Sequence, residues 1–374
     1  MRITNVEILR SKAPVTLPEP WRAAWTEPDG PEVREFRFAF YRVTTDVGIV
    51  GYGPHSGHPR PEALIGTDPM LVGAFFERYM GGRRAGNAGY NASGLEIALW
   101  DIVGKAAGLP IHHLLGVHRE RIMVYAATSR LMSVEQMVAQ VQSIAEQGFR
   151  AVKLRLHRPD PWDDLAVVEA VRDAVGDEML ILVDANQNNA SDAYSFWSRK
   201  TALEMAQELD ALGVYYLEEP LPRTDIEGLA EIAAMVDMYI AGGEHTPTVF
   251  DLREHLARGA YDIVQPDVSL GGNMGITGVR VAASWADLYG RLIIPHVMSG
   301  PGHLMSLAAT LHAMASVPNC PMIEYAYDPP VLTPETLQAV AQKPILVEED
   351  GCIPVPSGPG LGIGLDESQL EIVA

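Results

Sequence analysis

Short apolar runs alternate with helix-like segments through the middle and later parts of the chain. In the segment 165–175, Leu165, Val168, Val171 and Val175 share one face of a predicted helix. Nearly continuous apolar strands that alternate with amphipathic helices are typical of a parallel sheet covered on both faces. Most of the runs end in polar residues, and their number fits a β/α barrel better than an open sheet. The eight runs are 121–129, 151–157, 180–186, 214–220, 239–245, 262–269, 292–298 and 321–327.

The two ends of the chain follow other patterns. The segment 36–53 has the alternation of a strand meander, and 94–108 predicts a long helix, so the amino-terminal part is expected to be an α+β unit. The tail 347–367 is rich in Gly and Pro, and we expect it to leave the barrel and pack on the amino-terminal unit. The predicted organisation is an α+β capping domain (1–120), a barrel domain (121–335) and a returning carboxy-terminal segment (336–374).

Composition narrows the classes of partner. The 374 residues include 28 Lys and Arg against 48 Asp and Glu, which gives a formal charge of −20. This balance argues against nucleic acids and anionic membranes, because both select basic surfaces. The two cysteines offer no disulfide framework. The start of the chain has no signal-peptide pattern, and no apolar run approaches a membrane span, so we expect a cytoplasmic protein.

Three acidic side chains stand at the ends of consecutive predicted strands: Asp184, Glu218 and Glu244. The carboxyl ends of barrel strands meet at one mouth, so these side chains are expected to converge. Mg²⁺ prefers such oxygen ligands, and without a cation three converging carboxylates would repel one another. A single acid at such a place is more often an exposed loop residue. Three acidic residues at the same level of consecutive strands predict a metal site.

Basic and hydrogen-bonding groups follow the remaining strands. Lys153 and Arg155 are two residues apart on one strand, so both can point into the mouth. Asp267 and His296 end neighbouring strands, and an Asp beside a His makes a suitable general base, whereas a lone His would be read as a core residue. Glu324 is either a protonated hydrogen-bond donor to an oxyanion or a salt-bridged acid. Together these groups suit abstraction of a proton beside a carboxylate, because the resulting enediolate needs a metal, a cation and donors in place.

These motifs resemble the mandelate racemase-like branch of the enolase superfamily. The resemblance implies a modified TIM barrel, (β/α)7β, with a capping domain, and one Mg²⁺ per active site held by Asp184, Glu218 and Glu244. It further implies that Lys153 neutralises the substrate carboxylate, that His296 with Asp267 forms the acid/base dyad, and that Glu324 donates a hydrogen bond to the enediolate. The matching segments are 153–155, 183–186, 217–220, 242–245, 265–272, 294–296 and 322–325, with 94–116 and 358–367 outside the barrel.

One position departs from the racemase pattern, which has a second lysine where this chain has Arg155. A guanidinium is a poor base, which favours chemistry by His296 alone. We therefore expect a lyase that takes the α-proton of a sugar acid (an aldonate or aldarate) and eliminates the β-hydroxyl to give a 2-keto-3-deoxy acid. The alternative is a racemase, epimerase or cycloisomerase acting through the same enediolate. A barrel that has become a binding protein is a third reading, although no metal ligand is missing.

Specificity is expected to come from loops over the barrel mouth. A small-molecule carboxylate is the expected ligand, and assembly into a homo-oligomer is expected from the resemblance. For the tryptophans, packing of the loop on its own domain is the competing interpretation. The candidate substrate contacts are Trp21, Arg22, His55, Asn186 and His245, with Trp25 on the same loop as Trp21.

Overall fold

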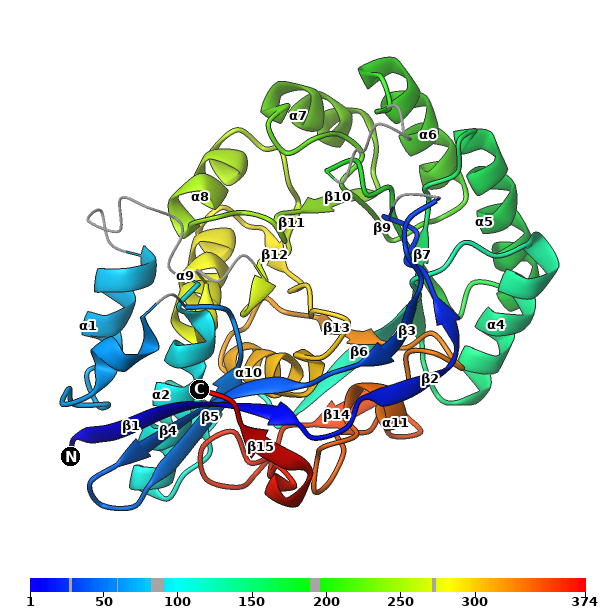
Figure 1. Ribbon diagram of the computed structural model, residues 1–374. Helices are drawn as coiled ribbons and strands as arrows, with labels where there is room; N and C mark the ends of the chain where they lie inside the picture. The colour runs from blue at the N-terminus through cyan, green and yellow to red at the C-terminus, as the bar shows by residue number, and fades with distance from the viewer. Residues whose placement is uncertain (27–28, 59, 82–90, 189–195, 271–273) are drawn as a thin grey trace.

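The computed structural model describes residues 1–26, 29–58, 60–81, 91–188, 196–270 and 274–374. Its centre is a parallel sheet in the order β12-β11-β10-β9-β8-β7-β6-β13. The last of these strands in the chain pairs with the first, so the sheet curls into a ring (Figure 1). The strands are β6 (Arg121–Ala127), β7 (Ala151–Arg155), β8 (Leu180–Asp184), β9 (Tyr216–Glu218), β10 (Tyr239–Gly242), β11 (Ile263–Val264), β12 (Leu292–Ile293) and β13 (Met322–Ala326).

A long helix follows each strand but the last, and only the four-residue α11 (Pro334–Leu337) follows β13, which confirms the (β/α)7β order. The helices surround the ring (Figure 1). On α5, Leu165, Val168 and Val171 are buried, as the apolar spacing predicts. The helices are α4 (Val134–Glu146), α5 (Pro161–Val175), α6 (Arg199–Ala211), α7 (Ile226–Met235), α8 (Val249–Ala257), α9 (Gly275–Leu288) and α10 (His303–Met314).

Alternation along the strands separates two apolar layers. In β7, Val152 and Leu154 belong to the large core between the sheet and the helices, whereas Ala151 belongs to a smaller cluster inside the ring. Lys153 and Arg155 share the inward parity of Ala151 and are buried. The strand therefore fills its outer face with aliphatic side chains and directs its two cations inward.

The capping domain contains an antiparallel sheet in the order β15-β1-β4-β5. Helix α2 (Ser93–Ala107) packs so tightly on β5 that a Cβ at Gly94 would lie 1.8 Å from the carbonyl oxygen of Pro54. The strands are β1 (Ile3–Ser11), β4 (Ala39–Thr45), β5 (Val50–Pro54) and β15 (Leu370–Ile372), beside the hairpin β2 (Val15–Trp21) and β3 (Val33–Phe36). The shorter helices are α1 (Val72–Phe76), α3 (Ile111–Leu115) and α11 (Pro334–Leu337).

The carboxy-terminal tail pairs with both parts of the molecule. Strand β14 (Cys352–Pro354) is antiparallel to the barrel strand β6, and β15 then pairs with β1 of the capping sheet. The tail thus pairs first with a barrel strand and then returns to the amino-terminal unit. The domain boundaries at 120 and 335 stay a prediction.

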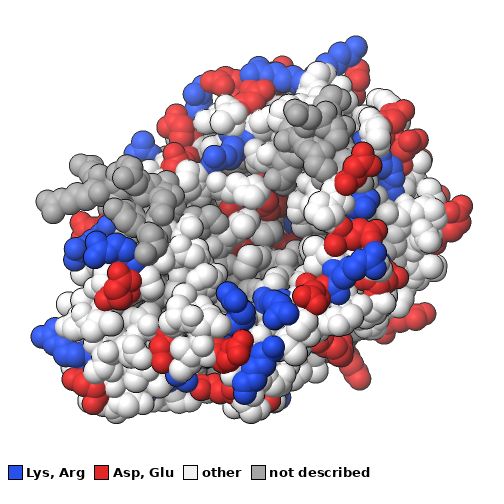
Figure 2. Space-filling model, viewed as in Figure 1, with Lys and Arg blue, Asp and Glu red and all other residues white. Residues whose placement is uncertain are grey.

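The face seen in Figure 2 is hollowed at its centre, and acidic and basic side chains are visible inside the hollow. Charged side chains of both signs are scattered over the rest of that face. Among the described residues, no helix combines the length and apolarity needed to cross a membrane.

Candidate active site

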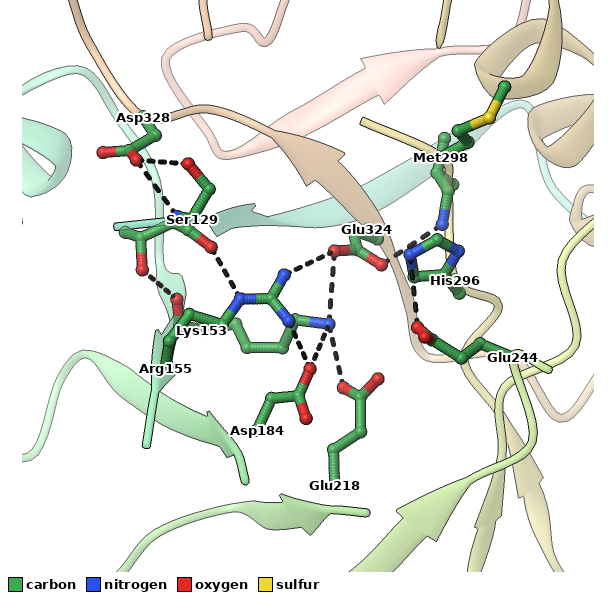
Figure 3. Close-up of polar contacts among 12 residues, drawn as sticks. Ser129, Lys153, Arg155, Asp184, Glu218, Glu244, His296, Met298, Glu324 and Asp328 are labelled. Atoms are coloured by element: carbon green, nitrogen blue, oxygen red, sulfur yellow. Dashed lines mark hydrogen bonds and ion pairs between the residues drawn. The ribbon is translucent and has the colours of Figure 1, made fainter. Parts of the chain in front are cut away.

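The two cations of β7 lie among carboxylates of β8, β9 and β13 (Figure 3). Lys153 Nζ lies 2.8 Å from Glu218 Oε2 and 3.2 Å from Glu324 Oε1, and its side chain is fully buried. Arg155 pairs with Asp184, which is its partner in the β7–β8 register. Burial works against the charge of Lys153, but Glu218 and Glu324 outweigh it and raise the pKa of the ammonium. Both cations therefore stay charged in the mouth of the barrel.

Arg155 is held in one orientation by three different contacts. Its Nε donates to the carbonyl oxygen of Thr128 at 2.8 Å, next to the ion pair with Asp184. The guanidinium also lies 4.6 Å from the ring centroid of Trp25, within cation–π range. The side chain is thus a fixed cationic wall of the site.

His296 and Asp267 form the dyad that the strand ends predict. His296 Nδ1 lies 2.6 Å from Asp267 Oδ2, and Asp267 Oδ1 accepts hydrogen bonds from the backbone N–H groups of Ser269 and Leu270. A carboxylate can only accept, so Nδ1 carries the hydrogen, and the other ring nitrogen, Nε2, lies 3.3 Å from Glu244 Oε2. Burial alone would lower the pKa of His296, but Glu244, Glu324 and Asp267 together raise it to about 10.

A pocket of about 180 Å³ opens beside this dyad. It includes the predicted residues Asn186 and His245, and Trp25 closes one side over Arg155. Sequence reasoning missed Met298, although a spacing of two residues from His296 was a usable signal. The lining residues are Trp25, Arg155, Asn186, Glu244, His245, Leu270, His296, Met298 and Ser299.

Two of the three predicted metal ligands lie at the ends of β8 and β9, and the third lies just after β10. The three carboxylates pair with different partners. Asp184 and Glu218 pair with the β7 cations, whereas Glu244 Oε1 lies 2.8 Å from His245 Nε2. Burial and the charge of Glu218 raise the pKa of Asp184 to about 7. Burial works in the same direction on Glu244, but His296 and His245 hold its pKa well below the usual range.

The chemistry of this donor set suits a divalent cation, although the ligand atoms of the three carboxylates do not all lie within 4.8 Å of one another. Glu218 Oε1 is buried and has no hydrogen-bond partner among the described residues, so one ligand oxygen is still available. The buried carboxylates of the mouth also outnumber its buried lysine and arginine, and a divalent ion would reduce this excess of negative charge. The carboxylates counted are Asp184, Glu218, Glu244, Asp267 and Glu324, and the basic side chains are Lys153 and Arg155.

Glu324 lies on β13 with its carboxylate between the cations and the dyad. Its Oε2 accepts from the backbone N–H of Val297 at 3.2 Å, and its Oε1 lies 3.8 Å from Arg155 Nη2. Burial would raise its pKa, but Lys153 and His296 outweigh burial and lower it. Glu324 is therefore an ionised acceptor here, and the donor role expected from the sequence requires a proton that this arrangement does not supply.

The capping-domain candidates lie outside the lining of this pocket. Trp21 is buried, and its Nε1 donates to Ser129 Oγ at 2.9 Å, so it anchors the β2 loop to the end of β6. Arg22 lies 3.7 Å from Glu32 in an exposed ion pair, and His55 packs on Tyr41 with the ring centroids 5.0 Å apart. The structure thus brings Trp25, rather than Trp21, next to Arg155.

Comparison with known proteins places the whole chain in one family. Residues 136–369 match a family described as enolase C-terminal domain-like, and residues 14–116 match the mandelate racemase and muconate lactonizing enzyme N-terminal domain. D-galactarolactone cycloisomerase of Agrobacterium fabrum is 32% identical over 88% of this chain and 89% of its own length. L-talarate/galactarate dehydratase of Salmonella typhimurium is 32% identical over 70% of this chain, a match that spans only 63% of that relative.

A solved structure agrees with these sequence matches. L-talarate dehydratase of Polaromonas sp. JS666, in complex with Mg and L-glucarate, superposes with a TM-score of 0.80 at 28% identity. The superposition covers 99% of this chain and 97% of that one. The relatives named dehydratase or cycloisomerase are enzymes of sugar acids and their lactones. With both of its domains matched, the chain belongs to the mandelate racemase and muconate lactonizing enzyme family of the enolase superfamily.

Proposed function

We propose that this chain is an Mg²⁺-dependent acid-sugar dehydratase that converts an aldonate or aldarate into a 2-keto-3-deoxy acid. The observation that carries the proposal is the pairing of one base with one cation across a single pocket. His296, fixed by Asp267 at 2.6 Å, faces a cavity whose other wall is Arg155, and a guanidinium does not serve as a second base.

Arg155 and Lys153 give the mouth its affinity for an anion despite the negative charge of the whole chain. Arg155 lines the pocket, where its planar donors suit a carboxylate or a hydroxyl of the substrate. Lys153 lies deeper and balances Glu218 and Glu324. A divalent cation held by Asp184, Glu218 and Glu244 would supply further positive charge beside the oxygens of the enediolate.

The proposed reaction uses one residue twice. A divalent ion on Glu244 would offset the charge that raises the pKa of His296, so the ring would be neutral when substrate binds. The unprotonated Nε2 of His296 then takes the α-proton, and the C–H electron pair moves into the carboxylate to give the enediolate. As the enediolate collapses, the bond from the β-carbon to its hydroxyl breaks, and the hydroxyl leaves as water with the proton that His296 returns. The enol that forms then tautomerises to the 2-keto acid, so atoms and charge balance without an external oxidant.

Glu324 lies where it can respond to the charge of the substrate. Its Oε1 contacts Lys153 at 3.2 Å and its Oε2 accepts from Val297 N–H, so the carboxylate is held toward the mouth. When the substrate carboxylate enters, its negative charge disfavours the ionised form of Glu324. We propose that Glu324 then takes up a proton and donates a hydrogen bond to the developing oxyanion.

The test is a panel of aldonic and aldaric acids incubated with purified protein and Mg²⁺, with detection of 2-keto acids. We expect keto acid from at least one sugar acid and none from the His296→Asn variant, which removes the base but not the proposed metal ligands. The absence of keto acid from the whole panel would overturn the proposal.

A second candidate function is a cycloisomerase on a sugar-acid lactone. The cycloisomerase relative aligns along nearly its full length with this chain, at the same identity as the talarate dehydratase relative. Lactone consumption without keto-acid release, or solvent deuterium entering the α-position of recovered substrate, would favour this candidate over dehydration.

We also propose that the protein works in the cytoplasm as a homo-oligomer with the domain boundaries given above. Free thiols at Cys320 and Cys352 support a reducing compartment. Light scattering on the purified full-length protein tests the assembly, and a monomeric mass would overturn it.

A further inference from the structure

Three potential metal-ligating side chains meet at the opposite end of the barrel from the pocket. His112 and His113 are adjacent on α3, and Glu120 immediately precedes β6 at the amino-terminal end of that strand. His112 Nε2 lies 3.1 Å from Glu120 Oε2, and His113 Nε2 lies 3.4 Å from Glu120 Oε1. Within the described part of the chain, this is the one set of three such side chains whose ligand atoms all lie within 4.8 Å of one another.

The buried histidine of this set is held from behind by a second histidine. His112 Nδ1 lies 3.0 Å from His312 Nδ1, and His312 Nε2 lies 3.0 Å from the carbonyl oxygen of Leu361. A carbonyl oxygen only accepts, so His312 Nε2 carries a hydrogen. Burial favours a neutral His312, whose Nδ1 is then an acceptor, and the hydrogen shared between the two Nδ1 atoms belongs to His112.

This hydrogen bonding determines what His112 presents to Glu120. With its hydrogen on Nδ1, the neutral ring directs the lone pair of Nε2 toward a carboxylate oxygen 3.1 Å away. Two acceptors at that distance repel unless a proton or a metal ion lies between them. The arrangement in which a metal-binding imidazole donates its other N–H to a fixed acceptor is the usual support of a ligating histidine.

We propose that His112 Nε2, His113 Nε2 and the Glu120 carboxylate form a binding site for a transition-metal ion of the Zn²⁺ class. Two imidazoles and one carboxylate are a donor set that Zn²⁺ accepts, with a fourth position for water. His113 and Glu120 are exposed, so the site is open to solvent on that side.

Metal binding here would join parts of the chain that are far apart in sequence. Helix α3 belongs to the amino-terminal domain, Glu120 leads into the first barrel strand, and His312 and Leu361 tie the site to α10 and the tail. The ion would therefore stabilise the junction between the capping domain and the barrel, and take no part in the chemistry of the pocket.

The test uses metal-free full-length protein that is first saturated with Mg²⁺, which favours oxygen ligands, and is then titrated with Co²⁺. Nitrogen ligation in a four-coordinate site gives Co²⁺ a stronger visible absorption than an all-oxygen octahedral site does. We expect a saturable visible band in the wild type. His113→Ala and Glu120→Gln, both at exposed positions, should weaken Co²⁺ binding at least tenfold. Loss of a group that only orients a metal ligand already lowers metal affinity by about 10- to 100-fold, and these two changes remove a ligand itself.

Two control variants separate this site from the pocket. His118→Ala removes an exposed histidine that lies between His113 and Glu120 in the sequence. Glu218→Gln removes a proposed Mg²⁺ ligand of the pocket. Both variants should keep the Co²⁺ band. Zn²⁺ should raise the melting temperature of the wild type and not that of His113→Ala. Equal Co²⁺ affinity in His113→Ala and the wild type, or loss of the band in Glu218→Gln, would overturn the proposal.

Discussion

The Nδ1 atom of His296 lies 2.6 Å from Oδ2 of Asp267, whose other oxygen is fixed by two backbone N–H groups. This contact sets the tautomer of the imidazole and leaves Nε2 free for the proton transfer of the proposed reaction. Asp267→Asn would let an amide face Nδ1 and favour the wrong tautomer. We expect kcat for keto-acid formation to fall about 10²–10⁴-fold, with KM changed much less.

Asp287→Asn, at an exposed position on α9, is the matched control and should keep wild-type kcat. Circular dichroism and Mg²⁺ binding of Asp267→Asn should match those of the wild type. Near-normal kcat in Asp267→Asn would show that the base of the reaction lies elsewhere.

The parts of the site that follow strand periodicity could be read from the sequence. Lys153 and Arg155 point inward because side chains two residues apart share a strand face, and His296 and Asp267 meet because adjacent parallel strands end together. The order of strands and helices in the barrel could likewise be read from the alternation of apolar runs and amphipathic helical segments.

Other parts depend on how distant segments pack, which no local pattern encodes. Trp25 comes over Arg155 only because Trp21 and Ala24 tie the loop after β2 to Ser129. Leu270 and Ser299 enter the pocket from loops without strand periodicity. The sequence motifs also say nothing of the ion pairs that divide the three predicted metal ligands.

Glu96 of the capping helix α2 caps a barrel helix that has no side-chain cap of its own. Its Oε2 accepts from the N–H of Ile276 at 2.9 Å, and its Oε1 accepts from the N–H of Thr277 at 3.1 Å, both in the first turn of α9. Glu96→Gln would replace one acceptor oxygen by an amide that faces N–H donors. We expect the free energy of unfolding to fall by about 2–3 kcal/mol in urea titrations.

Glu254→Gln, on the exposed side of α8, makes the same chemical change without a buried partner and should alter stability by less than about 0.5 kcal/mol. If Glu96→Gln were as stable as this control, the contact between the capping domain and α9 would contribute nothing measurable.

Arg155→Lys keeps the positive charge of this side chain but removes the planar guanidinium. An ammonium cannot keep both the hydrogen bond to the Thr128 carbonyl and the planar contact with Trp25. We expect KM for the accepted sugar acid to rise about tenfold, which corresponds to about 1.4 kcal/mol of lost binding. Arg199→Lys, in an exposed ion pair, should leave KM unchanged. An unaltered KM in Arg155→Lys would mean that the guanidinium does not contact substrate.

His303 at the start of α10 predicts a pH dependence of stability that is separate from the His296–Asp267 pair. Its Nδ1 donates to the Met298 carbonyl at 3.1 Å, and its fully buried ring is kept neutral because burial lowers its pKa to about 4. In the unfolded chain the pKa returns to 6.5. Between these values the unfolded state binds more protons than the folded one, so the contribution is complete above pH 6.5 and is lost as the pH falls toward 4.

The expected loss is about 3 kcal/mol over that interval. His303→Asn keeps a donor for the Met298 carbonyl but does not titrate, so its free energy of unfolding should fall less steeply with decreasing pH than that of the wild type. His118→Asn, at an exposed position, should follow the wild-type profile. Urea unfolding at a series of pH values measures both slopes. If His303→Asn and the wild type lost stability in parallel, the buried imidazole would not be the source of the acid sensitivity, and the carboxylates of the mouth would be the groups to examine.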